Sequence, residues 1–314
     1  MDYAFQAEGL VKRFGKQTAL SGLDLAAPAG TVLGVLGPNG AGKTTAIRIL
    51  ATLLSPDEGR AVVGGFDVVT QAHRVRRLIG LTGQYATVDE ELTAFENLVM
   101  VGQLLDLRKA EARSRADELL RQFDLRESGT QRASALSGGM RRRLDLAVSL
   151  VGRPRIVFLD EPTTGLDPGR REDLWRLVRS MTAEGVTVLL TTQYLEEADA
   201  LADHICVIDE GRVIADGTSA DLKRIVGGQT IVVRPVDPRQ ADVAAEVLEQ
   251  VARRRAEPVH RGVVTVPVED DRVLPEVVRR LVDADVRLAE FSLRLPSLDE
   301  AFFALTGRAE EVRR

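Results

Sequence analysis

One stretch decides the fold: Gly37-Pro38-Asn39-Gly40-Ala41-Gly42-Lys43-Thr44, which matches the phosphate-loop pattern G-x-x-x-x-G-K-[ST]. An apolar strand is predicted before it, over residues 31–36, and an amphipathic helix after it, over residues 43–54. The glycines let successive backbone N–H groups point at phosphate oxygens, and the start of the helix favours an anion at the same place. The stretch therefore predicts a nucleotide site in an α/β fold.

The side chains of this loop have separate expected roles. Lys43 is expected to reach the β- and γ-phosphates of a nucleotide, and the Thr44 hydroxyl is expected to bind Mg²⁺. Thr45 follows them at the start of the helix and is also predicted to contact ATP. The predicted ligands are therefore ATP and Mg²⁺.

A second motif follows further along the chain, at the end of an apolar run. Residues 156–159 read as a strand that is buried on both faces of a parallel sheet, and Asp160-Glu161 come directly after it. We expect Asp160 to hold Mg²⁺ at the sheet edge beside the phosphate loop. Glu161 is expected to be the catalytic base that accepts a proton from the attacking water.

The stretch Leu136-Ser137-Gly138-Gly139-Met140 predicts a second anion site. Ser137 is a suitable N-cap for a helix over residues 141–150, and a helix start of this kind also attracts anions. One nucleotide does not need two such helix starts from one chain. A second copy of the chain resolves this, with Ser137, Gly138 and Gly139 of one subunit contacting the ATP held by the other. Taken alone, the stretch would favour an ordinary capped loop over an anion site.

Together these motifs resemble the ATP-binding cassette (ABC) ATPases, over residues 3–228. The resemblance implies that Gln84 lies in the Q-loop and contributes to the Mg²⁺ site, and that Asp167 belongs to the D-loop. It also implies that Phe14 stacks on adenine, with a buried core Phe as the less favoured alternative. Two cassettes are expected to close head-to-tail over two ATP molecules.

The family likeness also sets the expected architecture. Residues 1–228 are expected to form the nucleotide-binding domain, with a RecA-like core, an antiparallel β subdomain and a helical subdomain over about residues 85–150. Strands are predicted near residues 3–11, 186–192 and 204–208. Residues 229–314 alternate on a smaller scale and are predicted to form an α+β accessory domain, with Pro267 on an edge strand.

One position departs from the family pattern. Where the family usually has a His after a core strand, this chain has Gln193. An amide can donate a hydrogen bond to the γ-phosphate but cannot carry a proton or a positive charge. Either hydrolysis is slower, or Glu161 performs the base chemistry and Gln193 positions groups; we favour the second.

The sequence around Gln193 narrows the resemblance further. The run over residues 191–199 and the tail over residues 296–307 are similar to the drug- and antibiotic-exporting cassettes of the daunorubicin-resistance type. That likeness implies an ATP-driven exporter with a drug or antibiotic-like cargo. Other cargo or direction, or a non-transport ABC ATPase of the translation-factor or DNA-repair type, is the alternative.

The composition of the chain limits the kinds of partner that the protein can have. The net charge is −5, which argues against a protein that coats nucleic acid, and the chain has a single cysteine, Cys206. No apolar run is long enough for a membrane span, and no signal peptide is visible. The family likeness implies a homodimer on the cytoplasmic face of the membrane, in contact with the membrane through a separate transmembrane permease. The run Arg141-Arg142-Arg143 is either a solvated helix face or a contact for phosphate or the partner subunit; we favour the solvated face.

Overall fold

The structure is a computed structural model that describes residues 3–83, 88–225, 229–256, 262–268 and 271–294, together with Leu298 and Phe302. The chain divides into two compact units, Met1–Ser219 and Ala220–Arg314. This division lies close to the boundary that the sequence predicts at residue 228, and that boundary stays a prediction. No helix of the described residues is long and apolar enough to cross a membrane.

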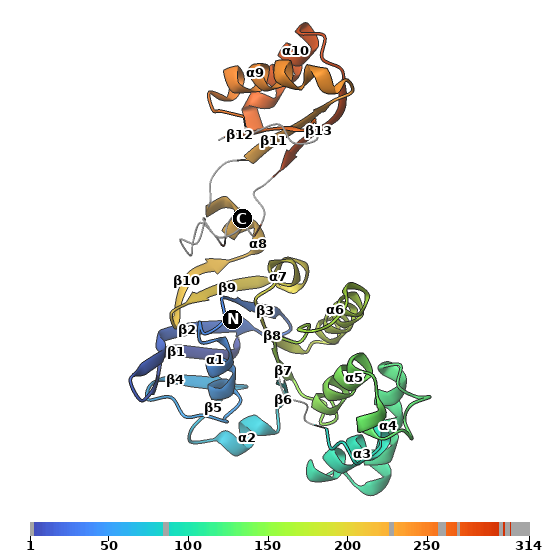
Figure 1. Cartoon of the computed structure of the whole chain (residues 1–314). Coiled ribbons are helices and arrows are strands. Elements are labelled where there is room, and N and C mark those ends of the chain that lie inside the picture. Colours follow the sequence, from blue (N-terminus) through green and yellow to red (C-terminus); the bar gives the residue numbers. More distant parts are fainter. Residues whose placement is uncertain are drawn as a thin grey trace. The chain divides into compact units, whose positions relative to one another are not determined.

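A six-stranded sheet forms the centre of the first unit (Figure 1). Five strands are parallel, and an antiparallel strand closes one edge. The order is β10 (Arg212–Gly217), β9 (His204–Asp209), β3 (Val32–Leu36), β8 (Thr187–Thr192), β7 (Ile156–Asp160) and β6 (Ile79–Thr82). The phosphate loop follows the central β3, and Asp160-Glu161 follow β7. Both motifs therefore meet at the carboxyl edge of the sheet, where α/β folds bind ligands.

A second, antiparallel sheet packs beside the first. Its order is β2 (Gln17–Pro28), β1 (Tyr3–Phe14), β4 (Glu58–Val63) and β5 (Phe66–Asp67). Strands β4 and β5 pair across the turn at Gly64-Gly65. Strands β2 and β10 have no counterpart in the sequence prediction, because their apolar residues are interrupted by Gly, Asp and Pro.

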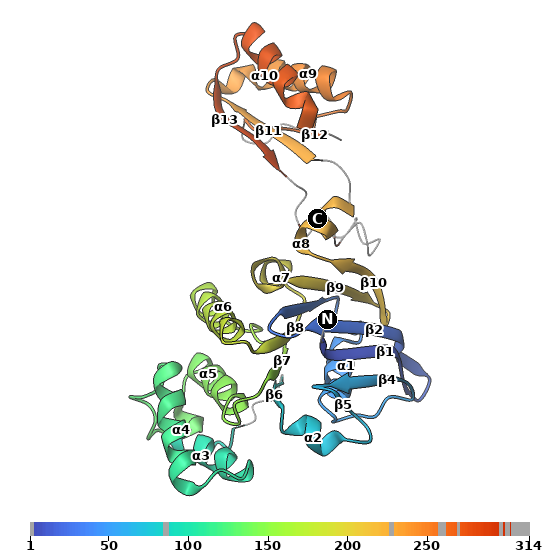
Figure 2. The same cartoon turned by 180° about the vertical axis from the view of Figure 1, so that it is seen from behind.

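Helices cover the six-stranded sheet on the side away from the antiparallel sheet (Figures 1 and 2). Helix α1 lies between the two sheets, and it ends four residues before the predicted end, at Leu50. The helical subdomain is confirmed as α3 to α5. The helices of this unit are α1 (Lys43–Leu50), α2 (Ala72–Arg76), α3 (Ala94–Leu104), α4 (Lys109–Gln122), η1 (Ala133–Ala135), α5 (Gly138–Ser149), α6 (Pro168–Ala183) and α7 (Leu195–Leu201).

Strand β7 shows how the two cores meet. All five of its residues are buried. Ile156 and Phe158 belong to the core shared with α1 and the antiparallel sheet, and the Phe158 ring meets Phe5 edge to face. Val157 and Leu159 belong to the core under the helices. The prediction of a strand buried on both faces is therefore confirmed, and this double packing fixes where Asp160 and Glu161 emerge.

The second unit is a smaller α+β arrangement. Strand β11 lies between β12 and β13, and the helices α9 and α10 pack on the sheet. Pro267 lies on the edge strand β12, as predicted, and the register of β13 slips between Leu288 and Glu290, as a bulge requires. The elements beyond the first unit are α8 (Ser219–Ile225), β11 (Gln229–Pro235), η2 (Pro238–Gln240), α9 (Ala241–Ala252), β12 (Val264–Val268), η3 (Asp271–Val273), α10 (Leu274–Asp283) and β13 (Leu288–Arg294).

Candidate functional site

The phosphate loop joins the buried strand β3 to helix α1. A Cβ at Gly37 would lie 2.3 Å from the carbonyl oxygen of Ile208, and Gly42 has a φ of +107°. Both positions therefore need glycine. Gly42 is the N-cap of α1 and supplies no side-chain hydrogen bond. The first N–H groups of the helix receive no cap from it, an arrangement that suits an anionic ligand.

Lys43 lies inside this loop and is 4% exposed. Its Nζ donates to the carbonyl oxygens of Gly37 at 2.7 Å and of Pro38 at 3.1 Å. It also lies 3.2 Å from Oε1 of Glu161. A buried ammonium group is stable only with such partners. The loop thus holds a cation next to the carboxylate at the end of β7.

Asp160 connects the end of β7 with α1 and β8. Its Oδ1 accepts hydrogen bonds from Thr44 Oγ1 at 3.2 Å and from Thr191 Oγ1 at 2.6 Å. The carboxylate and the Thr44 hydroxyl are oxygen donors of the kind that Mg²⁺ takes from a protein when phosphates and water supply the rest. These two residues fit a magnesium ion.

Glu161 has an unusual backbone for its residue type. It is 9% exposed and its φ is +48°, in the left-handed region that costs a non-glycine residue about 1–3 kcal/mol. Its N–H donates to the carbonyl oxygen of Thr191 at 3.1 Å and to Oγ1 of the same residue at 3.0 Å. Strained backbone that neighbouring bonds hold in place is typical of functional sites.

These groups surround one pocket of about 270 Å³. Phe14 is 51% exposed and lies on its wall, with Lys12 Nζ 5.9 Å from the ring centroid. The structure therefore brings Phe14 together with the phosphate loop and the end of β7. The lining residues are Phe14, Gln17, Ala19, Asn39, Gly40, Gly42, Lys43, Thr44, Thr45 and Glu161.

The Ser-Gly-Gly stretch begins helix α5, away from this pocket. Ser137 is the N-cap, and its Oγ accepts from the Met140 N–H at 3.3 Å. Gly138 has open space around it, whereas a Cβ at Gly139 would meet the Arg170 guanidinium at 2.3 Å. None of these three residues lines the phosphate-loop pocket. Within one chain, the described residues therefore form two separate half-sites.

Glu161 is common to both half-sites. Gly138, Gly139 and Leu166 line a groove of about 630 Å³, and Glu161 lies on the wall of that groove as well. At the far end, Asp167 is the N-cap of α6, and its Oδ1 accepts from the Arg170 N–H at 3.0 Å. The carboxylate of Glu161 thus lies between the phosphate loop and Ser137-Gly138-Gly139 of the same chain. We call this second stretch the signature.

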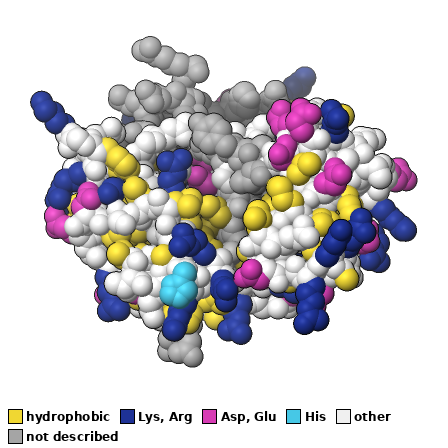
Figure 3. Space-filling model, turned by 90° about the horizontal axis from the view of Figure 1, so that it is seen from below, with side chains coloured by type: hydrophobic (Ala, Val, Ile, Leu, Met, Phe, Trp, Pro, Cys, Tyr) yellow, Lys and Arg dark blue, Asp and Glu magenta, His cyan; other side chains and the backbone are white. Residues whose placement is uncertain are grey.

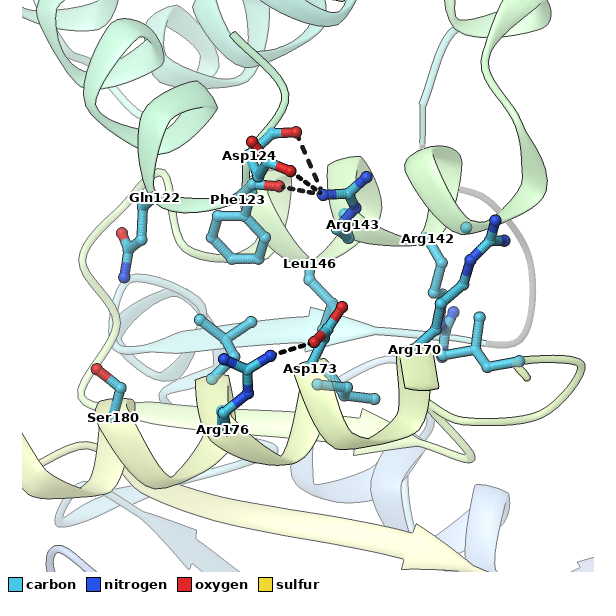
Figure 4. Close-up of a pocket in the computed structure, with 14 residues that line it drawn as sticks. Gln122, Phe123, Asp124, Arg142, Arg143, Leu146, Arg170, Asp173, Arg176 and Ser180 are labelled. Atoms are coloured by element: carbon cyan, nitrogen blue, oxygen red, sulfur yellow. Dashed lines mark hydrogen bonds and ion pairs between the residues drawn. The ribbon is translucent and has the colours of Figure 1, made fainter. Parts of the chain in front are cut away.

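A further cleft of about 560 Å³ lies between α4 and α5 on one side and α6 on the other (Figure 4). Four arginines line it, but at least three of them form ion pairs: Arg143 with Asp124, Arg170 with Asp167 and Arg176 with Asp173. The charges of the cleft are therefore largely satisfied within the chain.

The segment after β8 contacts the D-loop region. Gln193 is half-buried directly after β8, and the Arg171 guanidinium lies 4.7 Å from the ring centroid of Tyr194. Arg171 Nε also donates to the Leu166 carbonyl at 3.2 Å. Glu197 is 1% exposed and accepts from Thr163 Oγ1 at 3.0 Å. Burial raises the pKa of the Glu197 carboxyl above its usual value.

One sequence prediction needs a correction, and other predicted residues lie outside the described part of the chain. The solvated interpretation is wrong for Arg142, whose guanidinium bonds backbone carbonyls and whose pKa is lowered by burial. Cys206 is buried, and burial raises the pKa of its thiol, as an inert cysteine requires. Gln84 lies outside the described residues, as does most of the tail over residues 296–307. No cluster of three or more His, Cys, Asp or Glu suited to a metal occurs in the described part.

Sequence reasoning missed several site residues. Gln17 and Ala19 line the nucleotide pocket from β2, a strand that the prediction did not contain. Thr191 holds both Asp160 and Glu161, and its position in an apolar strand gave it the appearance of a core residue. The signal for Thr191 was the parallel pairing of β7 with β8, which places it opposite Asp160.

Comparison with known proteins gives the same assignment along the whole chain. The family model of ABC transporters matches residues 20–164, and the model of the C-terminal domain of DrrA1-3-like ATP-binding proteins matches residues 217–306. The chain is 54% identical to daunorubicin resistance ATP-binding protein DrrA2 of Streptomyces coeruleorubidus, over 98% of this chain and 97% of that protein. It is 45% identical to doxorubicin resistance ATP-binding protein DrrA of Mycobacterium tuberculosis, over 97% and 94%.

Solved structures agree. The ADP conformation of an ATP-binding cassette of an ABC transporter is 27% identical, with a TM-score of 0.64 over 70% of this chain and 93% of that one. A dimeric post-hydrolysis cassette bound to ADP and Pi is 25% identical, with a TM-score of 0.63 over 68% and 98%. The predicted fold class, a P-loop ABC cassette, is confirmed. The chain is an ATPase and belongs to the ATP-binding subunits of ABC transporters, within the daunorubicin-resistance group.

Proposed function

We propose that the protein is the ATP-hydrolysing subunit of an exporter that moves a drug or antibiotic-like compound through a separate membrane permease. One observation carries the proposal: Lys43, Asp160 and Glu161 meet at one edge of the sheet, beside a pocket that the phosphate loop and Phe14 line. The 54% identical relative is named for daunorubicin resistance, which supports the class of cargo.

The proposed reaction is in-line attack of water on the γ-phosphate. The phosphate loop and Lys43 hold the phosphates, so that Lys43 exchanges its ion pair with Glu161 for phosphate oxygens. Glu161 then accepts the proton of the water, the bond to the β-γ bridging oxygen breaks, and ADP and phosphate are released. Gln193, at the end of β8, positions groups around the γ-phosphate.

We further propose the remaining ATP and magnesium contacts. Thr44 and Asp160 hold Mg²⁺, with Gln84 as a further contact, and the ion neutralises charge on the phosphates. Phe14 stacks on the adenine ring, which its exposed position on the pocket wall supports. The other contacts come from the loop residues Gly37, Pro38, Asn39, Gly40, Ala41, Gly42 and Thr45.

The active form is proposed to be a head-to-tail homodimer. Ser137, Gly138 and Gly139 begin a helix outside the phosphate-loop pocket of their own chain, so a second copy gives them a nucleotide to contact. Asp167, in the proposed D-loop, is the N-cap of α6 and follows Leu166, which lines the groove. The similar cassette bound to ADP and Pi is dimeric, which supports a dimer for this chain.

The proposed location is the cytoplasmic face of the cell membrane, with membrane contact through the permease and no nucleic-acid partner. The end of the cassette with α2 and α3 exposes hydrophobic side chains among basic and acidic ones (Figure 3). Such a mixed surface favours a protein partner over a polyanion. Residues 1–228 are proposed as the cassette and residues 229–314 as the accessory domain.

The enzymatic part of the proposal is tested on the purified protein. Replacing Glu161 by Gln keeps the shape of the side chain but removes the base, so steady-state ATP hydrolysis is expected to stop while ATP still binds. Hydrolysis that survives in the Glu161→Gln variant would contradict the catalytic assignment.

The transport part is tested in cells that express the chain together with its permease. Accumulation of a daunorubicin-like drug is expected to fall with the wild-type pair and to stay high with the Glu161→Gln pair. Equal accumulation in both would remove the drug-export proposal while leaving the ATPase intact. Co-sedimentation with ribosomes would favour the translation-factor alternative.

A further inference from the structure

Arg142 joins helix α5 to the carboxyl edge of the central sheet. Its Nε donates to the Pro162 carbonyl at 2.9 Å, its Nη1 to the Gly83 carbonyl at 2.9 Å, and its Nη2 to the Glu161 carbonyl at 3.4 Å. One guanidinium therefore binds two segments, the end of β6 and the residues that follow β7. Its planar fork of donors allows this, which a lysine ammonium does not match.

The two neighbouring arginines bind elsewhere. Arg141 pairs with Glu90 at 2.8 Å and also donates to the Ala133 carbonyl. Arg143 donates to the carbonyls of Phe123 and Asp124, at the end of α4 (Figure 4). Both stay with partners in the helical subdomain. Of this run of three arginines, Arg142 is the one whose carbonyl partners follow the core strands β6 and β7.

Two of the carbonyls that Arg142 binds belong to a segment with strained backbone, Glu161-Pro162. Glu161 has the left-handed φ of +48°, and Pro162 follows it directly. Thr191 bonds the N–H of Glu161, and Arg142 bonds its carbonyl. A charged donor makes such hydrogen bonds stronger than neutral ones. Arg142 therefore helps to fix the direction of the Glu161 side chain.

We propose that Arg142 is a positioning residue that couples the signature of a chain to the catalytic Glu161 of the same chain. Ser137 begins the helix that carries Arg142, five residues further on. When nucleotide held by the second copy binds Ser137, the resulting shift of α5 moves the backbone of Glu161 and Pro162 through Arg142. The two ATP sites of the dimer are then linked through each chain.

This inference rests on the proposed head-to-tail dimer, and it makes a separate prediction. Loss of Arg142 is expected to affect turnover and the dependence of one site on the other, with little change in ATP binding to a single chain. Misplacing a catalytic group by about 1 Å costs roughly 100-fold in rate. A purely structural contact would instead lower the stability of the cassette and leave kcat and cooperativity intact.

The experiment compares Arg142→Gln with the matched control Arg143→Gln, in the full-length protein. ATP turnover is measured against ATP concentration, binding of a fluorescent ATP analogue is measured at low protein concentration, and unfolding is followed in urea. Arg142→Gln is expected to lower kcat by about 10- to 100-fold and to bring the Hill coefficient to 1, with analogue binding unchanged. Arg143→Gln is expected to keep the wild-type kcat and Hill coefficient.

A second variant, Arg142→Lys, keeps the charge and guards against a folding defect. It is expected to unfold at the wild-type urea concentration but to show the same loss of cooperativity. Wild-type kcat and cooperativity in both Arg142 variants, or equal losses in Arg142→Gln and Arg143→Gln, would overturn the inference alone. A wild-type Hill coefficient of 1 would show that the two sites of the dimer are independent, and it would overturn the inference as well.

Discussion

The two glycine-rich helix starts of the cassette differ in how their ends are satisfied. At α1, the N-cap Gly42 offers no side chain, and the loop is closed by Lys43 and the backbone. At α5, the hydroxyl of Ser137 caps its own helix. The first start is enclosed in a pocket, and the second opens on a groove with free space around Gly138.

This difference indicates that the two helix starts have different roles in binding nucleotide. An uncapped helix start in a pocket gains most from a bound phosphate, because its N–H groups have no other partner there. A capped helix start is stable without a ligand. It can therefore exist free in one chain and bind nucleotide only when a second copy of the chain brings it. Glu161 lines both the pocket and the groove, so we expect hydrolysis to depend on both helix starts.

The largest expected effect comes from adding one methyl group at the first helix start. In Gly42→Ala, the Cβ would lie 2.6 Å from the Ala19 carbonyl oxygen and 2.7 Å from Leu20 Cδ2, at a φ of +107°. Strain and overpacking together cost about 2–6 kcal/mol. Urea unfolding and nucleotide binding are expected to show a large loss.

The matched control adds the same methyl group at the second start. Gly138 has nothing within 4 Å of a built Cβ, so Gly138→Ala should change the free energy of unfolding by less than about 1 kcal/mol. Equal destabilisation by the two changes would break the comparison.

The next effect is the loss of the cap at α5. Ser137→Ala removes the acceptor for the Met140 N–H, and an N-cap of this type is worth about 1 kcal/mol. ATP turnover is expected to fall much further than this loss of stability explains, because Ser137 is proposed to contact nucleotide on the second copy as well. Turnover that stays at the wild-type level would show that Ser137 is a cap and nothing more.

A smaller effect is expected at Glu197, a buried residue of α7 that accepts a hydrogen bond from Thr163. Burial raises the pKa of the Glu197 carboxyl above its usual value of 4.5. The folded protein therefore binds the proton of this carboxyl more tightly than the unfolded chain does. The stability from this group is fully present below about pH 4.5 and is lost as the pH rises through the folded pKa. Glu197→Gln should lack that loss.

The check is the free energy of unfolding of both proteins, measured in urea at a series of pH values. The difference between them is expected to move in favour of Glu197→Gln as the pH rises above 4.5. A difference that stays constant with pH would show that Glu197 does not carry the raised pKa.

The smallest effect is expected at Gln193. If Glu161 is the base, Gln193→His should retain turnover close to the wild-type value. General acid-base catalysis contributes about 100-fold or more. A rise of that size in the Gln193→His variant, measured as kcat, would show that the residue after β8 carries a proton in this family and that the Gln slows this chain.

Much of the site could be predicted because each motif lies at the end of a strongly patterned element. The loop over residues 37–44 follows a short apolar strand, and Asp160-Glu161 end a strand whose every residue is buried. The contribution of β2 could not be predicted, because Gln17 and Ala19 reach the pocket through antiparallel pairing with β1, which leaves no local signal. Arg142 was misread for the same reason: its partners are distant carbonyls.

The most direct test of the account mixes two inactive variants. Lys43→Ala lacks a working phosphate loop, Ser137→Arg lacks a working signature, and each is expected to be inactive alone. In a mixed dimer, one loop and one signature are both intact. Random pairing makes half of the dimers mixed, so about a quarter of the sites should be complete and ATP hydrolysis should return. No recovery in the mixture would contradict a site shared between two chains.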